Sequence, residues 1–221
     1  MPKIVDHEKR RDEIAMVACR VVAEGGFDQA TIVRIAREAG YTTGMVAHYF
    51  DTKQDIIIAA LRLMLRRIDE RLQRNSESER PDLLALLTEM LPVDEERYIE
   101  CAFWIAFWGQ VTADKRMKRI NAWVHGEYQR LYERCLSRAW PEWRQWPSET
   151  RDSVRRSVST LINGLTAGAV ASRSDWPAEK QVEQARLQVA LLRDWAAKAA
   201  AAAAAKARKE RSSPGSGSSV A

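Results

Sequence analysis

The stretch GYTTGMVAHYF at residues 40–50 places hydrogen-bonding side chains on a turn of helix that is otherwise apolar. Threonine hydroxyls, an imidazole and a phenol can donate hydrogen bonds to phosphate oxygens or reach the edges of bases. Gly44 would let the backbone come close to such a partner. Each residue also has an ordinary alternative, because a threonine at a helix start is often only a cap and an exposed histidine often has no role. The surrounding elements decide between the two interpretations.

The residues before and after this stretch show the 3.6-residue period of amphipathic helices. A first helix is predicted over about residues 8–24, and Gly25-Gly26 ends it. Thr31 then fits the N-cap of a second helix of about eight residues, which stops at a glycine turn. A third, shorter helix follows that turn. Three short helices in this order have the proportions of a helix-turn-helix, here at about residues 31–50.

The third helix of a helix-turn-helix lies in the major groove, with its N-terminal end foremost and its inner face braced by the other two helices. Met45, Val46 and Phe50 suit the inner face. Small hydroxyl side chains at the tip can approach base edges, and tyrosine, histidine and lysine can donate to phosphate. The residues that we expect to contact DNA are Thr31, Thr42, Thr43, Gly44, Ala47, His48, Tyr49 and Lys53.

A longer fourth helix leads into the rest of the chain. Thr52 and Asp55 have the spacing of a capping box, and the apolar stripe continues to the polar stretch NSESERPD at residues 75–82. At 1.5 Å per residue such a helix spans roughly 34 Å and could reach from one domain into another. We therefore expect a DNA-binding domain at residues 8–68 and a larger helical domain at residues 76–200.

The larger domain is predicted to be helical throughout, so the expected fold class is all-α. Prolines separate five further helical segments, at about residues 82–91, 95–112, 115–140, 148–172 and 178–205. The end of the chain, residues 201–221, has low complexity. Its alanines favour helix, whereas its serine, glycine and proline residues indicate disorder. We expect a disordered tail there.

Aromatic residues and one carboxylate gather on two helices of the larger domain. Two tryptophans and two phenylalanines fall within CAFWIAFWGQV at residues 101–111, which is more rigid aromatic surface than a small helical core needs. Aromatic walls can enclose an apolar ligand, or a cationic one by cation–π attraction. Ordinary core packing is the alternative for each of them. The candidate effector-binding residues are Glu100, Trp104, Phe107, Trp108, Trp123 and Tyr128, with Glu100 placed to offset a cation's charge.

Composition and charge narrow the classes of function. The chain has 221 residues and a net charge of +5, but four units of this excess lie in residues 198–221, where five Lys or Arg accompany one Glu. Net charge alone is therefore weak support for a nucleic-acid partner. The charged N-terminus and the lack of a long apolar run favour a cytoplasmic protein with no membrane partner. Cys19, Cys101 and Cys135 indicate buried reduced thiols, and no spacing predicts a catalytic site, a metal or a cofactor.

The stretch from Arg11 to about Leu65 closely resembles the N-terminal domain of the TetR family of bacterial transcriptional regulators. The matching residues are Thr31, Ile35-Ala36, Ala39-Gly40, Gly44, Tyr49-Phe50 and Lys53, in the register of the family's pattern. Tyr41 departs from that pattern, because the family more often has a small or β-branched aliphatic residue there. The departure raises the question of what the Tyr41 side chain touches.

Part of the larger domain resembles the C-terminal domain of the betaine-operon (BetI-type) repressors within this family. The segments AFWIAFWGQV, RINAWVHGEYQRLYERCL and TLINGL carry the resemblance. It implies a ligand-responsive repressor that leaves its double-stranded DNA operator when a small-molecule effector binds. The repressors of that subgroup respond to choline, a quaternary ammonium ion. A quaternary ammonium effector and an uncharged hydrophobic one both fit the aromatic residues of this chain.

The family resemblance also implies a homodimer through the last two helices, at about residues 148–172 and 178–197. Gly164 and Gly168 have the spacing that permits close helix approach. The apolar stripe of the final helix is Leu187, Leu191 and Trp195. Packing within one chain is the alternative. Two other functions stay open: a transcriptional activator of the same family, and a helical small-molecule-binding protein or enzyme with a vestigial DNA-binding domain.

Overall fold

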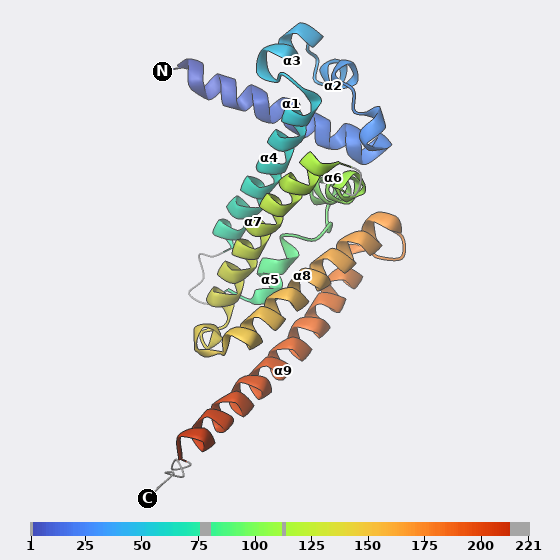
Figure 1. The fold of residues 1–221 in the computed structure, drawn as a ribbon. Helices are drawn as coiled ribbons and strands as arrows, with labels where there is room; N and C mark the ends of the chain where they lie inside the picture. The colour runs from blue at the N-terminus through green and yellow to red at the C-terminus, as the bar shows by residue number, and fades with distance from the viewer. Residues whose placement is uncertain (1, 76–80, 112–113, 213–221) are drawn as a thin grey trace, which may run out of the picture.

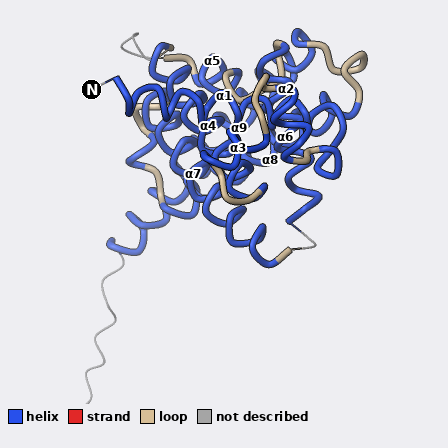
Figure 2. Tube along the Cα trace, turned by 90° about the horizontal axis from the view of Figure 1, so that it is seen from above, coloured by secondary structure: helices blue, strands red, loops and turns tan. Residues whose placement is uncertain are grey.

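The computed structural model describes residues 2–75, 81–111 and 114–212, and over these residues the chain is mostly helical and has no strand (Figure 1, Figure 2). The predicted all-α fold class is confirmed. The helices are α1 (Pro2–Gln29), α2 (Ile32–Glu38), α3 (Thr43–Tyr49), α4 (Lys53–Arg74), α5 (Leu83–Thr88), α6 (Glu95–Val111), α7 (Lys115–Ala139), the 3₁₀ turn η1 (Trp143–Gln145), α8 (Ser148–Ala171) and α9 (Ala178–Ser212). None of the described helices is long and apolar enough to cross a membrane.

Helices α1–α3 form the predicted trihelical unit at one end of the molecule (Figure 1). α1 begins at Pro2, six residues before the predicted start at about residue 8. Its helical geometry breaks at Gly26, whose φ of 75° lies where residues with side chains are strained. Gly40, with a φ of 72°, turns the chain between α2 and α3. Both predicted glycine stops are confirmed.

Side-chain caps begin the next three helices. The Oγ1 atoms of Thr31 and Thr42 each accept a hydrogen bond of 3.1 Å from the backbone N–H three residues further on. At the start of α4, the Thr52 N–H donates to Asp55 Oδ2 at 3.0 Å, and the Asp55 N–H donates to Thr52 Oγ1 at 3.2 Å. These bonds satisfy backbone groups that have no partner within a helix. The three predicted helix starts are confirmed.

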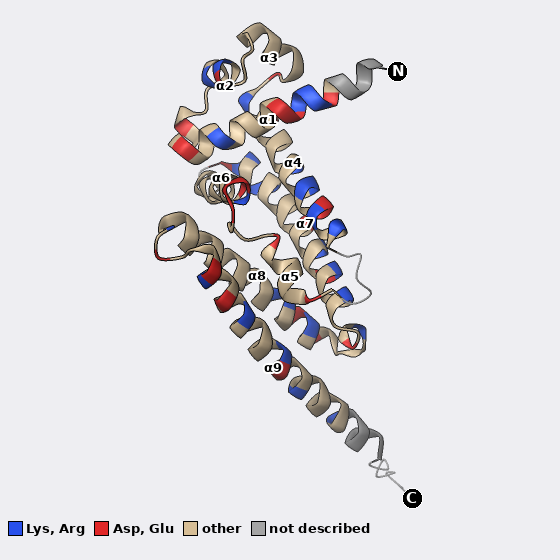
Figure 3. Ribbon diagram, turned by 180° about the vertical axis from the view of Figure 1, so that it is seen from behind, with Lys and Arg blue, Asp and Glu red and all other residues tan. Residues whose placement is uncertain are grey.

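Helix α4 runs from the trihelical unit into the body of the molecule (Figure 1). It ends at Arg74, close to the predicted end, and its 22 residues span roughly 33 Å. Basic and acidic residues both occur along α4 and α7 (Figure 3). An ion pair of 3.5 Å joins Arg116, at the start of α7, to Asp55 of the α4 capping box. Most of the predicted linker, residues 76–80, lies outside the described residues.

The first buried cluster joins helices from both predicted domains. α6 packs against α1, and Phe103 lies on Phe27 with ring centroids 5.7 Å apart. Phe107 of α6 and Met117 of α7 are buried in the same cluster as the inner residues of α1–α4. The predicted boundary near the linker therefore separates the two segments in sequence, but α6 and α7 share one hydrophobic core with α1–α4.

The second buried cluster lies between the second half of α4, α5, α7, η1, α8 and α9. Trp140, Trp143 and Trp146 are buried in it, and the indole N–H of Trp143 donates to Glu133 Oε1 at 2.7 Å. α8 and α9 lie side by side, and α9 continues past α8 to Ser212 (Figure 1). The prediction of a disordered tail from residue 201 is wrong as far as Ser212, because the alanine run continues α9 to that residue. Residues 213–221 lie outside the described residues.

Candidate nucleic-acid interface and internal cavity

The outer face of α3 consists of small and polar residues. Thr43, Gly44, Ala47 and His48 are exposed, while Val46 and Phe50 are buried against the other helices. A Cβ added to Gly44 would meet only the Thr42 hydroxyl, at 3.9 Å, so the surface around it is open. α3 contains no Lys or Arg (Figure 3). The helix therefore offers hydroxyl, backbone and imidazole groups rather than charge.

Met45 is not an inner residue, contrary to prediction. Its side chain is 42% exposed. Neighbouring positions on an α-helix are turned by about 100°, so burying Val46 carries Met45 out to the rim of the exposed face. The inner face of α3 is thus narrower than the apolar residue types suggest.

The residues expected to contact phosphate already have partners within the chain. The Lys53 ammonium donates to the Phe27 carbonyl oxygen, at the end of α1, and lies 5.9 Å from the Phe27 ring centroid. Tyr49 is half-buried, with its ring 4.7 Å from the His7 ring and 5.3 Å from the His48 ring. Lys53 keeps two further N–H donors. Its first contact in the free protein is nevertheless a helix cap.

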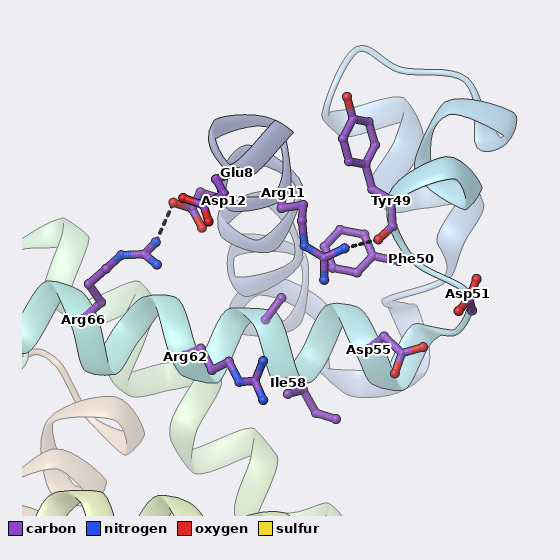
Figure 4. A pocket seen from close by; sticks show the side chains of 11 residues that line it. Glu8, Arg11, Asp12, Tyr49, Phe50, Asp51, Asp55, Ile58, Arg62 and Arg66 are labelled. Carbon is purple, nitrogen blue, oxygen red and sulfur yellow. Dashed lines mark hydrogen bonds and ion pairs between the residues drawn. The ribbon is translucent and has the colours of Figure 1, made fainter. Parts of the chain in front are cut away.

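An open groove of about 480 Å³ lies between the first half of α1 and α4, beside the end of α3 (Figure 4). Arg11 spans its upper wall: the guanidinium donates to the Tyr49 carbonyl oxygen and lies 4.2 Å from the Phe50 ring centroid. Arg66 of α4 pairs with Asp12 of α1 across the groove. The Arg11 contacts fix the end of α3 to α1, and the Arg66–Asp12 pair joins α4 to α1. The groove contains charges of both signs and none of the residues predicted to bind an effector.

Tyr41 fastens the turn between α2 and α3 to α1. Its hydroxyl donates to Glu13 Oε2 at 2.6 Å and accepts a hydrogen bond from the Arg10 guanidinium. The hydrogen bond to Glu13 raises the pKa of the Tyr41 phenol. Where the family more often has an aliphatic residue, the Tyr41 phenol therefore makes a polar contact with Glu13 and Arg10 of α1.

An internal cavity lies where α4, α6, α7 and α8 meet. Its water-accessible volume is about 20 Å³, which is room for about one water molecule. Its lining includes Met64, Arg71, Glu100, Trp104, Tyr128 and Thr166. The Trp104 and Tyr128 ring centroids are 5.5 Å apart. Burial raises the pKa of the Tyr128 phenol well above its usual value, so the cavity faces a neutral hydroxyl. The site is closed in this structure.

Glu100 is the centre of a buried ion cluster. Its side chain is 4% exposed. Oε1 accepts from Arg67 Nε at 2.7 Å, and Oε2 accepts from Arg71 Nη2 at 2.7 Å. Both arginines belong to α4, so the cluster fastens α4 to α6. In this closed cavity two guanidinium groups already neutralise the Glu100 carboxylate, and its role toward a ligand's cation stays a prediction.

Three of the six predicted effector-binding residues line the cavity: Glu100, Trp104 and Tyr128. Phe107 is fully buried in the first core cluster. Trp108 packs edge-on against Trp104, with ring centroids 5.6 Å apart, but does not line the cavity. Trp123 is 38% exposed and lies under the Arg62 guanidinium, 5.7 Å from it. The last three do not line the closed cavity, and their contact with an effector stays a prediction.

The residues that sequence reasoning missed are the charged ones around the cavity: Arg71, Glu89 and Arg97. Arg71 carried a usable signal, because it follows Ile68 by three residues and precedes Leu72 on the buried face of α4. An arginine within an apolar stripe needs a buried partner. Which carboxylate supplies that partner is not a local property of the sequence.

The fold has the arrangement of a helical DNA-binding protein: the helix-turn-helix carries the exposed helix α3, and the long helix α4 that follows it also lines an internal cavity. Comparison with known families agrees. Residues 14–60 match the family model of bacterial regulatory proteins of the TetR family, and residues 79–194 match that of the C-terminal domain of BetI-type transcriptional repressors. The chain belongs to the TetR family of transcriptional regulators, with a BetI-type C-terminal domain.

Individual proteins show the same likeness. The HTH-type transcriptional regulator PksA of Bacillus subtilis is 36% identical over 110 residues, which cover 48% of this chain and 54% of that protein. The regulator BetI 1 of Chromohalobacter salexigens is 28% identical over 181 residues, covering 77% and 84% of the two chains. A protein of Saccharomonospora viridis, described as a transcriptional regulator and crystallised with choline, shares the fold with a TM-score of 0.65 and 20% identity, over 80% of this chain and 94% of that one.

Proposed function

We propose that the chain is a repressor that binds its operator as a homodimer through α3 and is released when a small molecule opens the internal cavity. One observation carries this proposal: the closed cavity has a charged wall that is also the fastening between α4 and α6. A ligand larger than water must disturb that wall. Because α4 continues directly from the trihelical unit, the same disturbance reaches the DNA-facing helices.

The exposed face of α3 is proposed to read bases in the major groove. Thr43 and Gly44 lie at its N-terminal tip, and Ala47 and His48 lie one turn further on. Since α3 has no positive charge of its own, cations on its neighbours must meet the phosphates. Lys53 and the exposed α2 residue Arg37 are the candidates. Thr31 and Thr42 then act mainly as caps that present backbone N–H groups.

The homodimer is proposed to form through one face of α8 and α9. Leu187, Leu191 and Trp195 are exposed along α9, and Gly164 of α8 has no atom within 4 Å of an added Cβ. Gly168 has a different role from the one expected. An added Cβ there would lie 3.1 Å from Trp176 Nε1 of the same chain, so this glycine admits an indole within the monomer. A dimer would place two recognition helices one DNA turn apart, about 34–36 Å.

Release is proposed to follow from the cavity's shape. In the closed state Arg67 and Arg71 hold α4 against α6. Ligand binding would favour a state in which α4 has moved, and the spacing of the two recognition helices would then no longer fit the operator. The choline complex of the Saccharomonospora viridis protein supports quaternary ammonium compounds as the first class to test, and uncharged hydrophobic compounds are the second.

The test is DNA binding with and without candidate effectors. We expect the purified chain to retard a DNA fragment from upstream of its own gene, and an effector to release it and be recovered unchanged. An activator would bind the same DNA but raise transcription from it, whereas an enzyme would consume the compound. Failure to retard any upstream or selected DNA would refute the proposal. A regulator of this kind acts in the cytoplasm.

A further inference from the structure

We infer that α3 reads the C5-methyl groups of thymine bases, and that Met45 and Ala47 are the side chains that contact these methyl groups. The inference rests on the proposed function, because it names the chemical feature of the operator that the same helix recognises. The residue types of α3, TGMVAHY at residues 43–49, suit this feature of a base pair better than any other.

The side chains that distinguish guanine, adenine and cytosine most strongly are absent from α3. Arginine and lysine pair with guanine, asparagine and glutamine pair with adenine, and glutamate and aspartate accept from cytosine. None of these six residue types occurs among residues 43–49, all of which the structure describes. The Thr43 hydroxyl and the His48 imidazole can make single hydrogen bonds, which several bases accept. The thymine methyl is the remaining feature of the major groove that marks one base, and apolar side chains read it.

The turn of the helix places two apolar side chains beside the line that faces outward. Successive residues of an α-helix are about 100° apart. Val46 is fully buried, so Gly44 and His48, two positions away on either side, lie close to the opposite, outward line. Met45 and Ala47, one position away on either side, flank that line. The outward line of α3 therefore has an apolar group on each side of it.

Gly44 allows these flanking groups to come near the bases. It has no side chain, and an added Cβ there would meet only the Thr42 hydroxyl, at 3.9 Å. The N-terminal turn of α3 can therefore approach the floor of the groove until the neighbouring side chains touch it. The Met45 side chain is 42% exposed and Ala47 is exposed as well, so both present apolar surface that can cover a methyl group. Such a contact removes apolar surface of both partners from water, which favours binding.

Duplexes in which uracil replaces thymine test the inference, because uracil lacks only the C5-methyl group and pairs with adenine in the same way. The starting duplex is the sequence that the full wild-type chain selects from random DNA. Each test duplex carries uracil at one symmetric pair of thymines, and its affinity is measured by fluorescence anisotropy. Burying one methyl-sized group corresponds to about fourfold in affinity. A two-fold operator loses two such groups, so we expect about a fifteenfold loss at the pairs that α3 contacts and no loss at thymines outside the half-sites.

Two variants assign the contacts to residues. Met45→Gln keeps the length and the helix propensity of the side chain but replaces its methyl end with an amide. Ala47→Gly removes the Cβ atom, and Ala197→Gly is its matched control, because it makes the same substitution at an exposed position of α9. In each α3 variant the loss caused by uracil should fall to about twofold or less at one symmetric pair, whereas the control should keep the wild-type pattern.

The outcomes separate the inference from the proposed function. If the chain binds its selected duplex but uracil at every thymine of the half-sites leaves the affinity within about twofold, the methyl readout is refuted and the proposed DNA-binding function stands. Half-sites without thymine would refute the readout in the same way. If uracil weakens binding by Met45→Gln and by Ala47→Gly as much as binding by the wild type, the methyl groups are read elsewhere and the inference fails. If the chain selects no DNA, the proposed function fails together with the inference.

Discussion

The ion cluster at Glu100 makes a quantitative prediction about stability. The substitution Glu100→Gln keeps the size of the side chain and one carbonyl oxygen but removes the charge that Arg67 and Arg71 share. Two charge-assisted hydrogen bonds of 2.7 Å are lost or weakened, and Arg71, 9% exposed, keeps two longer contacts to Glu89, of 3.5 Å to the carboxylate and 3.3 Å to the backbone carbonyl oxygen. Leaving a buried charge short of its partner costs about 3–5 kcal/mol. We expect the lower end, about 3 kcal/mol, because Arg67 is partly exposed.

The assay is urea unfolding followed by helical circular dichroism, with thermal unfolding as a second measurement. A loss of about 3 kcal/mol corresponds to a fall of roughly 6–12 °C in Tm for a chain of this size. The matched control is Glu96→Gln, which removes the other carboxylate paired with Arg67; that side chain is 61% exposed. Exposed pairs contribute about 0–1 kcal/mol. If the two variants lose the same stability, the cluster does not fasten α4 to α6 as described.

Three further predictions test other parts of the molecule. Burial raises the pKa of the Cys101 and Cys135 thiols from 9.0 to about 12. Below pH 9 both thiols are protonated in the folded and the unfolded chain, and as the pH rises from 9 toward 12 the free energy of unfolding should fall by about 1.4 kcal/mol per pH unit for each thiol. Unfolding midpoints measured on both sides of pH 9 test this. Leu191→Glu should convert a dimer to monomers in sedimentation experiments, whereas Ala197→Glu, which adds the same charge elsewhere on α9, should not; a monomeric wild type would refute the dimer. Lys53→Ala should weaken binding to all DNA sequences alike and lower the salt slope by about one unit, and an unchanged slope would leave Lys53 only its role as a cap on α1.

Local features of the trihelical unit could be predicted because their causes lie within a few residues. Thr31 and Thr42 cap the helices that they begin, and Gly40 turns the chain where a positive φ is needed. The capping box and the length of α4 follow from equally short patterns. Met45 differs because its exposure depends on its angle around the helix: it is apolar and adjoins the buried Val46, yet it lies on the outer side of α3.

The cavity could be predicted only in part, because its walls come from four helices far apart in sequence. Trp104 and Trp123 are equally aromatic, yet one lines the cavity and the other lies on the surface, since the crossing of α6 and α7 decides which faces meet. The pairing of Glu100 with Arg71 joins residues 29 positions apart. Residue type indicated that the carboxylate could bind a cation. Only the packing revealed that the cation is already present within the chain.

The central claim is that the exposed face of α3 reads a two-fold operator, and selection of bound fragments from random DNA tests it most directly. The wild-type chain should enrich a symmetric sequence whose half-sites lie one helical turn, or a multiple of it, apart. The Thr43→Ala variant should select a different base at one symmetric pair of positions, while Ala197→Glu should select the wild-type sequence. The account would be contradicted if the wild-type chain enriched no sequence or one without two-fold symmetry. It would also be contradicted if the Thr43→Ala and Ala47→Asn variants of α3 both selected the wild-type bases.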